Sequence, residues 1–118
     1  MKIKPVLAFS CFIIGFVIAR VFTTLHPSTV LVTSGGIHIH HFWFGLILVL
    51  LGGGLGLAEE SEEIKDVGAV FYGFGSGLIM DEVGLLLTMG NYWTSLTFVI
   101  LVIVVAVCII VISLYELI

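Results

Sequence analysis

Four long runs of apolar residues, separated by short polar stretches, set the pattern of this chain. They cover residues 5–25, 37–58, 67–90 and 92–118. Each run is about as long as the roughly 20 residues that a helix needs to cross a bilayer. The pattern therefore predicts an all-α integral membrane protein, with four transmembrane helices in a single domain that covers residues 1–118.

The predicted helices differ in their content of small residues. The second and third are rich in glycine, whereas the fourth has none. Glycines four residues apart, such as Gly52 with Gly56 and Gly73 with Gly77, let helix backbones approach closely in lipid. Gly45 adds a further small residue to the second helix. We expect a compact bundle with the second and third helices at its centre. Glycine faces this extensive also favour a homo-oligomer or a place in a larger membrane complex.

Composition supports a membrane location and excludes one class of partner. The chain is 60% hydrophobic and only 10% charged, with a mean hydropathy of +1.31. A soluble domain carries more charge on its surface. No basic patch is present, so the sequence does not indicate nucleic-acid binding. The expected partner is the lipid bilayer.

The lysines predict the orientation. Lys2, Lys4 and Lys65 all fall on one side of the membrane if both termini share that side, and the two opposite connections carry no Lys or Arg. Lys and Arg favour cytoplasmic loops. The sequence therefore predicts a multi-pass protein of the plasma membrane with cytoplasmic N- and C-termini.

Ionisable residues inside a membrane span are costly unless they are paired or hydrated, which makes them candidates for a functional site. In or beside the predicted spans they are Arg20, His38, His40, His41, Asp81 and Glu82. If the second and third helices form a hairpin that turns near Ser61, His41 and the acidic pair each lie about 20 residues from the turn, which at 1.5 Å per residue gives similar depths. A similar count along the first helix brings Arg20 to this layer, in the outer half of the membrane.

The spacing of the histidines suggests which of them share a face. His38 and His41 are three positions apart, so a helix would project both from one side, and Gly45 would continue that side inward. His40 would point elsewhere unless the first turn were irregular.

The two carboxylates are adjacent, and adjacent residues diverge by about 100° around a helix. Asp81 continues the face of Gly73 and Gly77, while Glu82 continues that of Gly68 and Gly75. We therefore expect one carboxylate to meet the histidines. The other would meet Arg20 or a neighbouring subunit.

Imidazoles combined with carboxylates are a ligand set for Fe, Mn, Zn or Cu. The first functional prediction is thus a bound transition metal, with chemistry on a lipid or quinone-like molecule as one use of it. The predicted ligands are His38, His41, Asp81 and Glu82, with His40 as a further candidate imidazole. Arg20 would balance the remaining charge or bind an anionic group of a substrate. Haem is not favoured, because the chain has no second well-placed histidine within a span.

Two alternatives use the same residues. Histidine and carboxylate side chains also line proton and ion paths, which would make the chain a proton- or cation-conducting or transporting oligomer. In the second alternative, Arg20 pairs with a carboxylate only to hold the helices together, as in a structural or accessory subunit. The sequence leaves open whether the protein is an enzyme.

Overall fold

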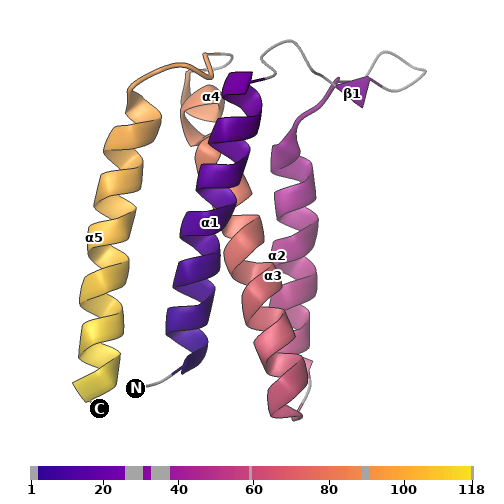
Figure 1. Cartoon of the computed structure of the whole chain (residues 1–118), viewed down its shortest axis with the longest axis vertical. Coiled ribbons are helices and arrows are strands. Elements are labelled where there is room, and N and C mark those ends of the chain that lie inside the picture. The colour runs from indigo at the N-terminus through magenta and orange to yellow at the C-terminus, as the bar shows by residue number, and fades with distance from the viewer. Residues whose placement is uncertain (1–2, 26–30, 33–37, 59, 89–90, 118) are drawn as a thin grey trace.

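The computed structural model describes residues 3–25, 31–32, 38–58, 60–88 and 91–117, and for residues 31–32 and 38–39 it describes the backbone alone. This part of the chain is helical apart from one short ladder, as Figure 1 shows. The elements are α1 (Ile3–Leu25), β1 (Leu31–Val32), β2 (His38–Ile39), α2 (His41–Ala58), α3 (Glu62–Asp81), α4 (Val83–Leu87) and α5 (Leu96–Leu117). The predicted all-α class is confirmed.

The second helix starts later than predicted. Residues 38–39 form β2, which pairs antiparallel with β1 so that Val32 faces His38. The first helical turn follows, and the Trp43 N–H donates to the His40 carbonyl at 3.1 Å. The prediction of a helix from residue 37 is therefore wrong at its start, because a backbone already paired in a ladder is not available for helical hydrogen bonds.

Helix α3 lies between α1 and α2 and contacts both along their lengths (Figure 1). Its contact with α2 depends on facing glycines. A Cβ atom at Gly45 would lie 2.6 Å from the Gly75 carbonyl oxygen, and one at Gly52 would lie 2.5 Å from the Gly68 oxygen. No side chain fits at such distances, so glycine is what allows these backbones to touch.

A second glycine face of α3 packs on α1. Cβ atoms at Gly73 and Gly77 would clash with the carbonyls of Ala8 and Phe12. Gly15 on α1 approaches α3 in the same way, since its Cβ would lie 2.5 Å from the Phe74 oxygen. The two glycine faces of α3 therefore hold α1 and α2 on different sides.

The central position belongs to α3 alone, and the prediction that α2 shares it is wrong. A Cβ atom added at Gly53, Gly54 or Gly56 of α2 would meet no atom of another described element within 4 Å. Only one face of α2 is covered, and α2 lies at the edge of the described bundle. The glycine pattern showed which residues allow close packing but could not show which faces are used.

These contacts give a matched test of packing. A Gly45→Ala substitution is expected to lower the stability of the protein by about 1–3 kcal/mol, because the added methyl group forces two helices apart. Thermal unfolding in a mild detergent would measure it. Gly54→Ala is the control in the same helix, and we expect it to change the melting temperature little or to raise it. Equal effects from both substitutions would contradict the packing described here.

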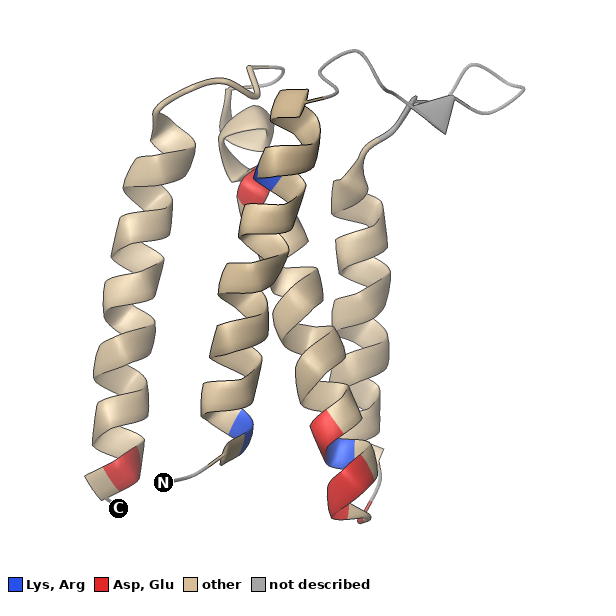
Figure 2. Cartoon of the chain, viewed as in Figure 1, with Lys and Arg blue, Asp and Glu red and all other residues tan. Residues whose placement is uncertain are grey.

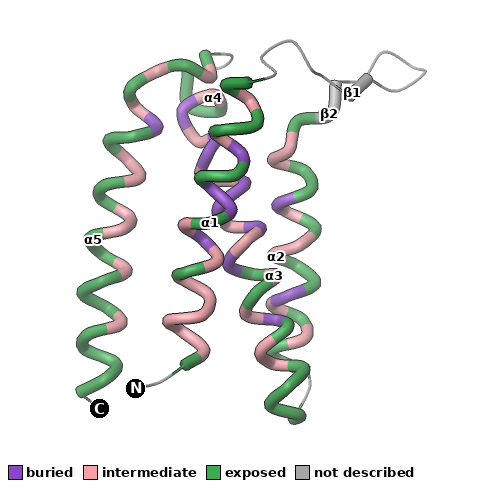
Figure 3. The backbone as a smooth tube through the Cα atoms, viewed as in Figure 1, coloured by how far each residue is buried: buried purple, intermediate pink, exposed green. Residues whose placement is uncertain are grey.

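Within the described residues, three helices are long and apolar enough to cross a membrane: Ile3–Leu25, His41–Ala58 and Leu96–Leu117. Helix α3 has a comparable length but begins with Glu62 and Glu63 and ends at Asp81. The predicted apolar run 67–90 is not one helix, because the chain turns at Glu82 before the short helix α4. Figure 3 shows the buried residues gathered mainly where α1, α3 and α4 meet.

Candidate functional site

The break between α3 and α4 places two carboxylates in the interior. Asp81 is the last residue of α3, and Glu82 occupies a turn with φ −106° and ψ 8°. Their exposed fractions are 0% and 2%. In Figure 2 this charge lies near the end of the bundle opposite the two termini, apart from the charged residues at the other end. Buried carboxylates of this kind are stable only with compensating partners.

Arg20 of α1 is the partner of Asp81. Its Nε atom lies 2.6 Å from Asp81 Oδ1, and its Nη2 atom donates a hydrogen bond to the Asp81 carbonyl oxygen at 3.0 Å. The carbonyls at a helix C-terminus carry partial negative charge. The guanidinium therefore compensates both the Asp81 carboxylate and the end of α3.

Aromatic rings enclose the Arg20 guanidinium. Its Cζ atom lies 4.2 Å from the centroid of Tyr92, 4.9 Å from that of Phe98 and 5.6 Å from that of Phe16. Such distances permit cation–π attraction. The Tyr92 hydroxyl also donates to Asp81 Oδ2 at 2.5 Å. The ion pair is thus covered by residues of α1, of α5 and of the connection before α5.

Glu82 faces the N-terminus of α2. Its Oε1 accepts a hydrogen bond from the Phe42 N–H at 2.8 Å, one of the backbone donors that has no partner within the first turn of a helix. The positive end of the helix dipole favours an anion there. On the other oxygen, His40 Nδ1 lies 3.5 Å from Glu82 Oε2, and the His40 side chain is 49% exposed.

His41 lies between the two carboxylates. Its Nε2 atom is 2.9 Å from Asp81 Oδ2 and 3.2 Å from Glu82 Oε1. This nitrogen is buried and its N–H is not aligned for a hydrogen bond with either oxygen. We call Arg20, His41, Asp81 and Glu82 the charged cluster. It holds two carboxylates against one guanidinium, so one negative charge remains for a proton on His41 or another cation to offset.

The structure brings together most of the residues that the sequence indicated. Asp81 meets Arg20, Glu82 meets the start of α2, and His41 contacts both carboxylates. The side chain of His38 lies outside the described residues. Its backbone belongs to β2, so the expectation that His38 and His41 share a helix face is wrong.

We expected only one of the two carboxylates to meet the histidines, and this expectation is also wrong in part. Adjacent positions diverge by about 100° only in a continuous helix, and Asp81 and Glu82 lie on either side of a helix end. The turn at Glu82 brings both carboxylates to one imidazole, that of His41. The exception allowed for His40 applies, because this residue precedes α2 and approaches Glu82 from the surface.

The predicted metal centre lies only partly among the residues whose side chains the structure describes, which do not include His38. Among these described residues, no group of three or more His, Cys, Asp or Glu side chains is arranged to hold a metal ion. The contacts of Asp81 give a physical reason why this carboxylate is not arranged to bind a metal. Its two oxygens are already in contact with Arg20, Tyr92 and His41, so a metal would have to displace one of these partners.

Tyr92 is the member of the site that the sequence did not reveal, since an aromatic residue at the start of the last apolar run also fits the ring of aromatic residues at a membrane interface. Burial, and then the hydrogen bond to Asp81, hold the pKa of the Tyr92 phenol far above its ordinary value. We expect this phenol to remain protonated in the folded protein at a pH that deprotonates an ordinary tyrosine, whose pKa is about 10. The difference in ultraviolet absorbance titrations between the wild type and Tyr92→Phe would show it. A phenolate step near the ordinary tyrosine pKa of about 10 that disappears in the variant would contradict this geometry.

Comparisons of the chain with protein-family models, with curated proteins and with solved structures found no match.

Proposed function

We propose that this protein is a membrane transporter that binds one proton, or one monovalent cation in its place, at the charged cluster. The observation that carries the proposal is the charge count. Arg20 compensates one of two buried carboxylates, and the His41 nitrogen lies within 3.2 Å of both. A proton on His41 makes the cluster neutral, which a low-dielectric interior strongly favours.

The same count disfavours a divalent metal ion. With a neutral imidazole, the guanidinium and the two carboxylates sum to one negative charge, so a divalent cation would leave an excess positive charge beside Arg20. A proton or a monovalent ion leaves none. Exchange of such ions needs no redox partner and no enzyme chemistry.

The surroundings of the cluster support a carrier that alternates between two states. His40 is half-exposed and lies 3.5 Å from Glu82, so it connects the cluster to the solvent at its own end of the bundle. On the other side, the chain has no Asp, Glu, Lys, Arg or His between Asp66 and Asp81. A continuous path of charged side chains along α3 is therefore missing, and we expect an ion to cross only if the helices move.

We further propose that α1, α2, α3 and α5 all span the plasma membrane, with both termini in the cytoplasm. The lysines support this orientation, because Lys4 lies beside Glu62 and Asp66 at the end of the bundle that carries the termini, and Lys65 follows in the first turn of α3. The charged cluster then lies in the outer half of the membrane. The uncovered Gly53, Gly54 and Gly56 support assembly into a homo-oligomer or a larger membrane complex.

Ion flux into liposomes tests the proposal. The purified protein is reconstituted with Na⁺, K⁺ or the bulky cation choline inside, the outside is acidified, and an enclosed dye reports the internal pH. We expect proton entry, with dependence on the internal ion if the transport is an exchange. A His41→Gln substitution should slow it about tenfold or more, because Gln keeps a polar group but binds no proton. Proton entry no faster than in empty liposomes under all three conditions would contradict the proposal.

Elemental analysis separates this function from the predicted metal centre, which remains the second candidate because two carboxylate oxygens lie within 3.2 Å of His41 Nε2. The protein must be purified without a histidine tag. We expect far less than one transition-metal ion per chain. A metal present at one ion per chain in the wild type, and lost in His41→Gln, would replace the transport proposal with the metal one.

A further inference from the structure

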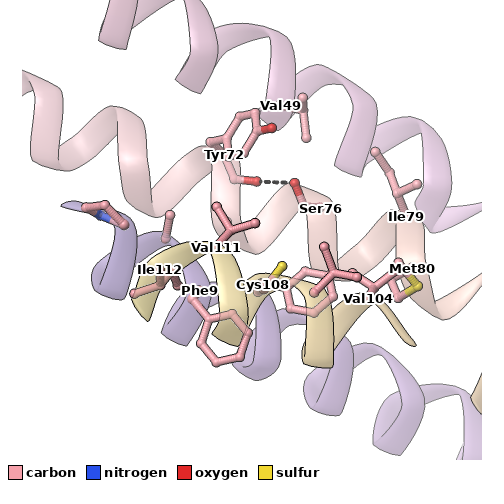
Figure 4. Close-up of a pocket in the computed structure, with 15 residues that line it drawn as sticks. Phe9, Val49, Tyr72, Ser76, Ile79, Met80, Val104, Cys108, Val111 and Ile112 are labelled. Carbon is pink, nitrogen blue, oxygen red and sulfur yellow. Dashed lines mark hydrogen bonds between the residues drawn. The ribbon is translucent and has the colours of Figure 1, made fainter. Parts of the chain in front are cut away.

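A crevice separates α5 from α1 and α3 below the charged cluster. Its volume is about 490 Å³, within the range of about 300–1,000 Å³ that is common for ligand pockets. Figure 4 shows the side chains around it, among them Phe9 of α1, Val49 of α2, Tyr72 and Met80 of α3, and Val104 and Cys108 of α5. The walls are almost wholly apolar, and the hydroxyl of Ser76 already donates to the Tyr72 carbonyl at 2.7 Å.

The crevice exists because the contacts that attach α5 to the other helices lie near its N-terminal end. The Gly84 N–H of α4 donates to the buried Thr97 Oγ1 at 3.1 Å, and Phe98 stacks edge-on against Phe16 with centroids 6.2 Å apart. Both contacts lie in the first turn of α5. Farther along, apolar residues of α5 form one wall of the crevice, while α1, α3 and Val49 of α2 form the other.

We propose that this crevice is a binding site for the hydrocarbon chains of a membrane lipid. None of its lining side chains is charged, and the hydroxyls among them belong to Ser76, which is already hydrogen-bonded, and to Tyr72. In the membrane placement proposed above, on which this inference rests, acyl chains surround the crevice, because it is lined by α1 and α5, two helices that are long and apolar enough to cross a bilayer. Flexible acyl chains fit an irregular apolar gap that opens toward lipid. Each buried methylene contributes about 0.8 kcal/mol relative to water.

The proposal goes beyond ion transport and does not depend on it, because the charged cluster contributes no wall to the crevice. It assigns the space between α5 and α3 to a bound lipid that supports α5 where protein contacts are missing. A lipid in this position would remain with the protein after gentle extraction from the membrane.

A phospholipid with a photoactivatable group in its acyl chain tests the site in reconstituted protein. Mass spectrometry then locates the labelled residues. We expect labelling at crevice residues that excess unlabelled phospholipid suppresses. Val104→Trp, which fills the crevice, should reduce this labelling about fivefold, the equivalent of about 1 kcal/mol. The control Val102→Trp changes a 68% exposed residue of the same helix and should leave crevice labelling unchanged.

Labelling spread over the exposed side of α5, insensitive to competitor and to Val104→Trp, would overturn the proposal. A second measurement avoids altering the walls. Cys11→Ser leaves Cys108, which lines the crevice, as the only thiol. Added phospholipid should slow its alkylation by a membrane-permeant maleimide in detergent, and an unchanged rate would also count against the site. Glu82→Gln should label like the wild type, so failure of the transport proposal is recognised separately.

Discussion

Replacing Asp81 by Asn is expected to destabilise the protein by about 3–5 kcal/mol, the usual cost of leaving one member of a buried ion pair without its partner. Asp81 is fully buried, and its carboxylate lies 2.6 Å from Arg20 Nε. The amide would leave the guanidinium uncompensated among the rings of Tyr92 and Phe98. Few other substitutions in the chain should cost as much.

Unfolding in detergent would measure this loss of stability. Two further variants test whether the unpaired charge is its cause. The double variant Arg20→Met with Asp81→Leu removes both charges and should recover most of the lost stability, because an apolar pair can replace a buried salt bridge. Glu62→Gln alters the ion pair of Lys4 with a carboxylate whose side chain is 72% exposed, and should change stability little. If the double variant were as unstable as Asp81→Asn, the charge would not be the cause.

Replacing Glu82 by Gln is expected to reduce ion transport about tenfold or more while the protein remains folded, because the change removes the charge that a transported cation offsets. Gln keeps the size of Glu and an oxygen that can accept the hydrogen bond from the Phe42 N–H. In the wild type this bond is 2.8 Å long. With Glu82 neutral, Arg20 and Asp81 balance each other and His41 has no remaining charge to compensate. Two adjacent carboxylates would then have different roles, Asp81 in stability and Glu82 in transport.

The liposome assay measures the loss, and the melting temperature of each variant shows whether the fold is intact. Glu60→Gln is the control, since Glu60 is an exposed carboxylate in the link between α2 and α3. Undiminished flux in Glu82→Gln would exclude Glu82 as the ion-binding carboxylate. A collapse of stability equal to that of Asp81→Asn would instead assign both residues to packing.

Much of this arrangement follows from counting along the sequence. Equal distances from the turn near Ser61 brought His41 and the acidic pair to one depth, and the structure places them in contact. Helical periodicity also separated the glycine face of Asp81 from that of Glu82, and these faces pack on α1 and α2, respectively. Depth and periodicity depend only on regular helix geometry, which the sequence pattern shows directly.

The remaining features depend on breaks in that regularity. The turn at Glu82 and the ladder before His41 place both carboxylates near one imidazole. Nothing in the apolar run 67–90 marks such a break. Tyr92 was missed for a different reason, because its contact with Asp81 requires a chain reversal after α4. Tertiary contacts of this kind are not encoded in the period of one helix.

The distance in sequence between Arg20 and Asp81 has a consequence for biosynthesis. The ribosome must add 61 residues after Arg20 before its partner exists, which takes several seconds at about 5–20 residues per second. During that time α1 carries an uncompensated cation. A long side chain in this situation reaches toward the headgroups, so the nascent first helix should stay shallow in the translocon or bilayer until α3 is made. Final placement of the first helix is therefore a late event, completed by the arrival of the third.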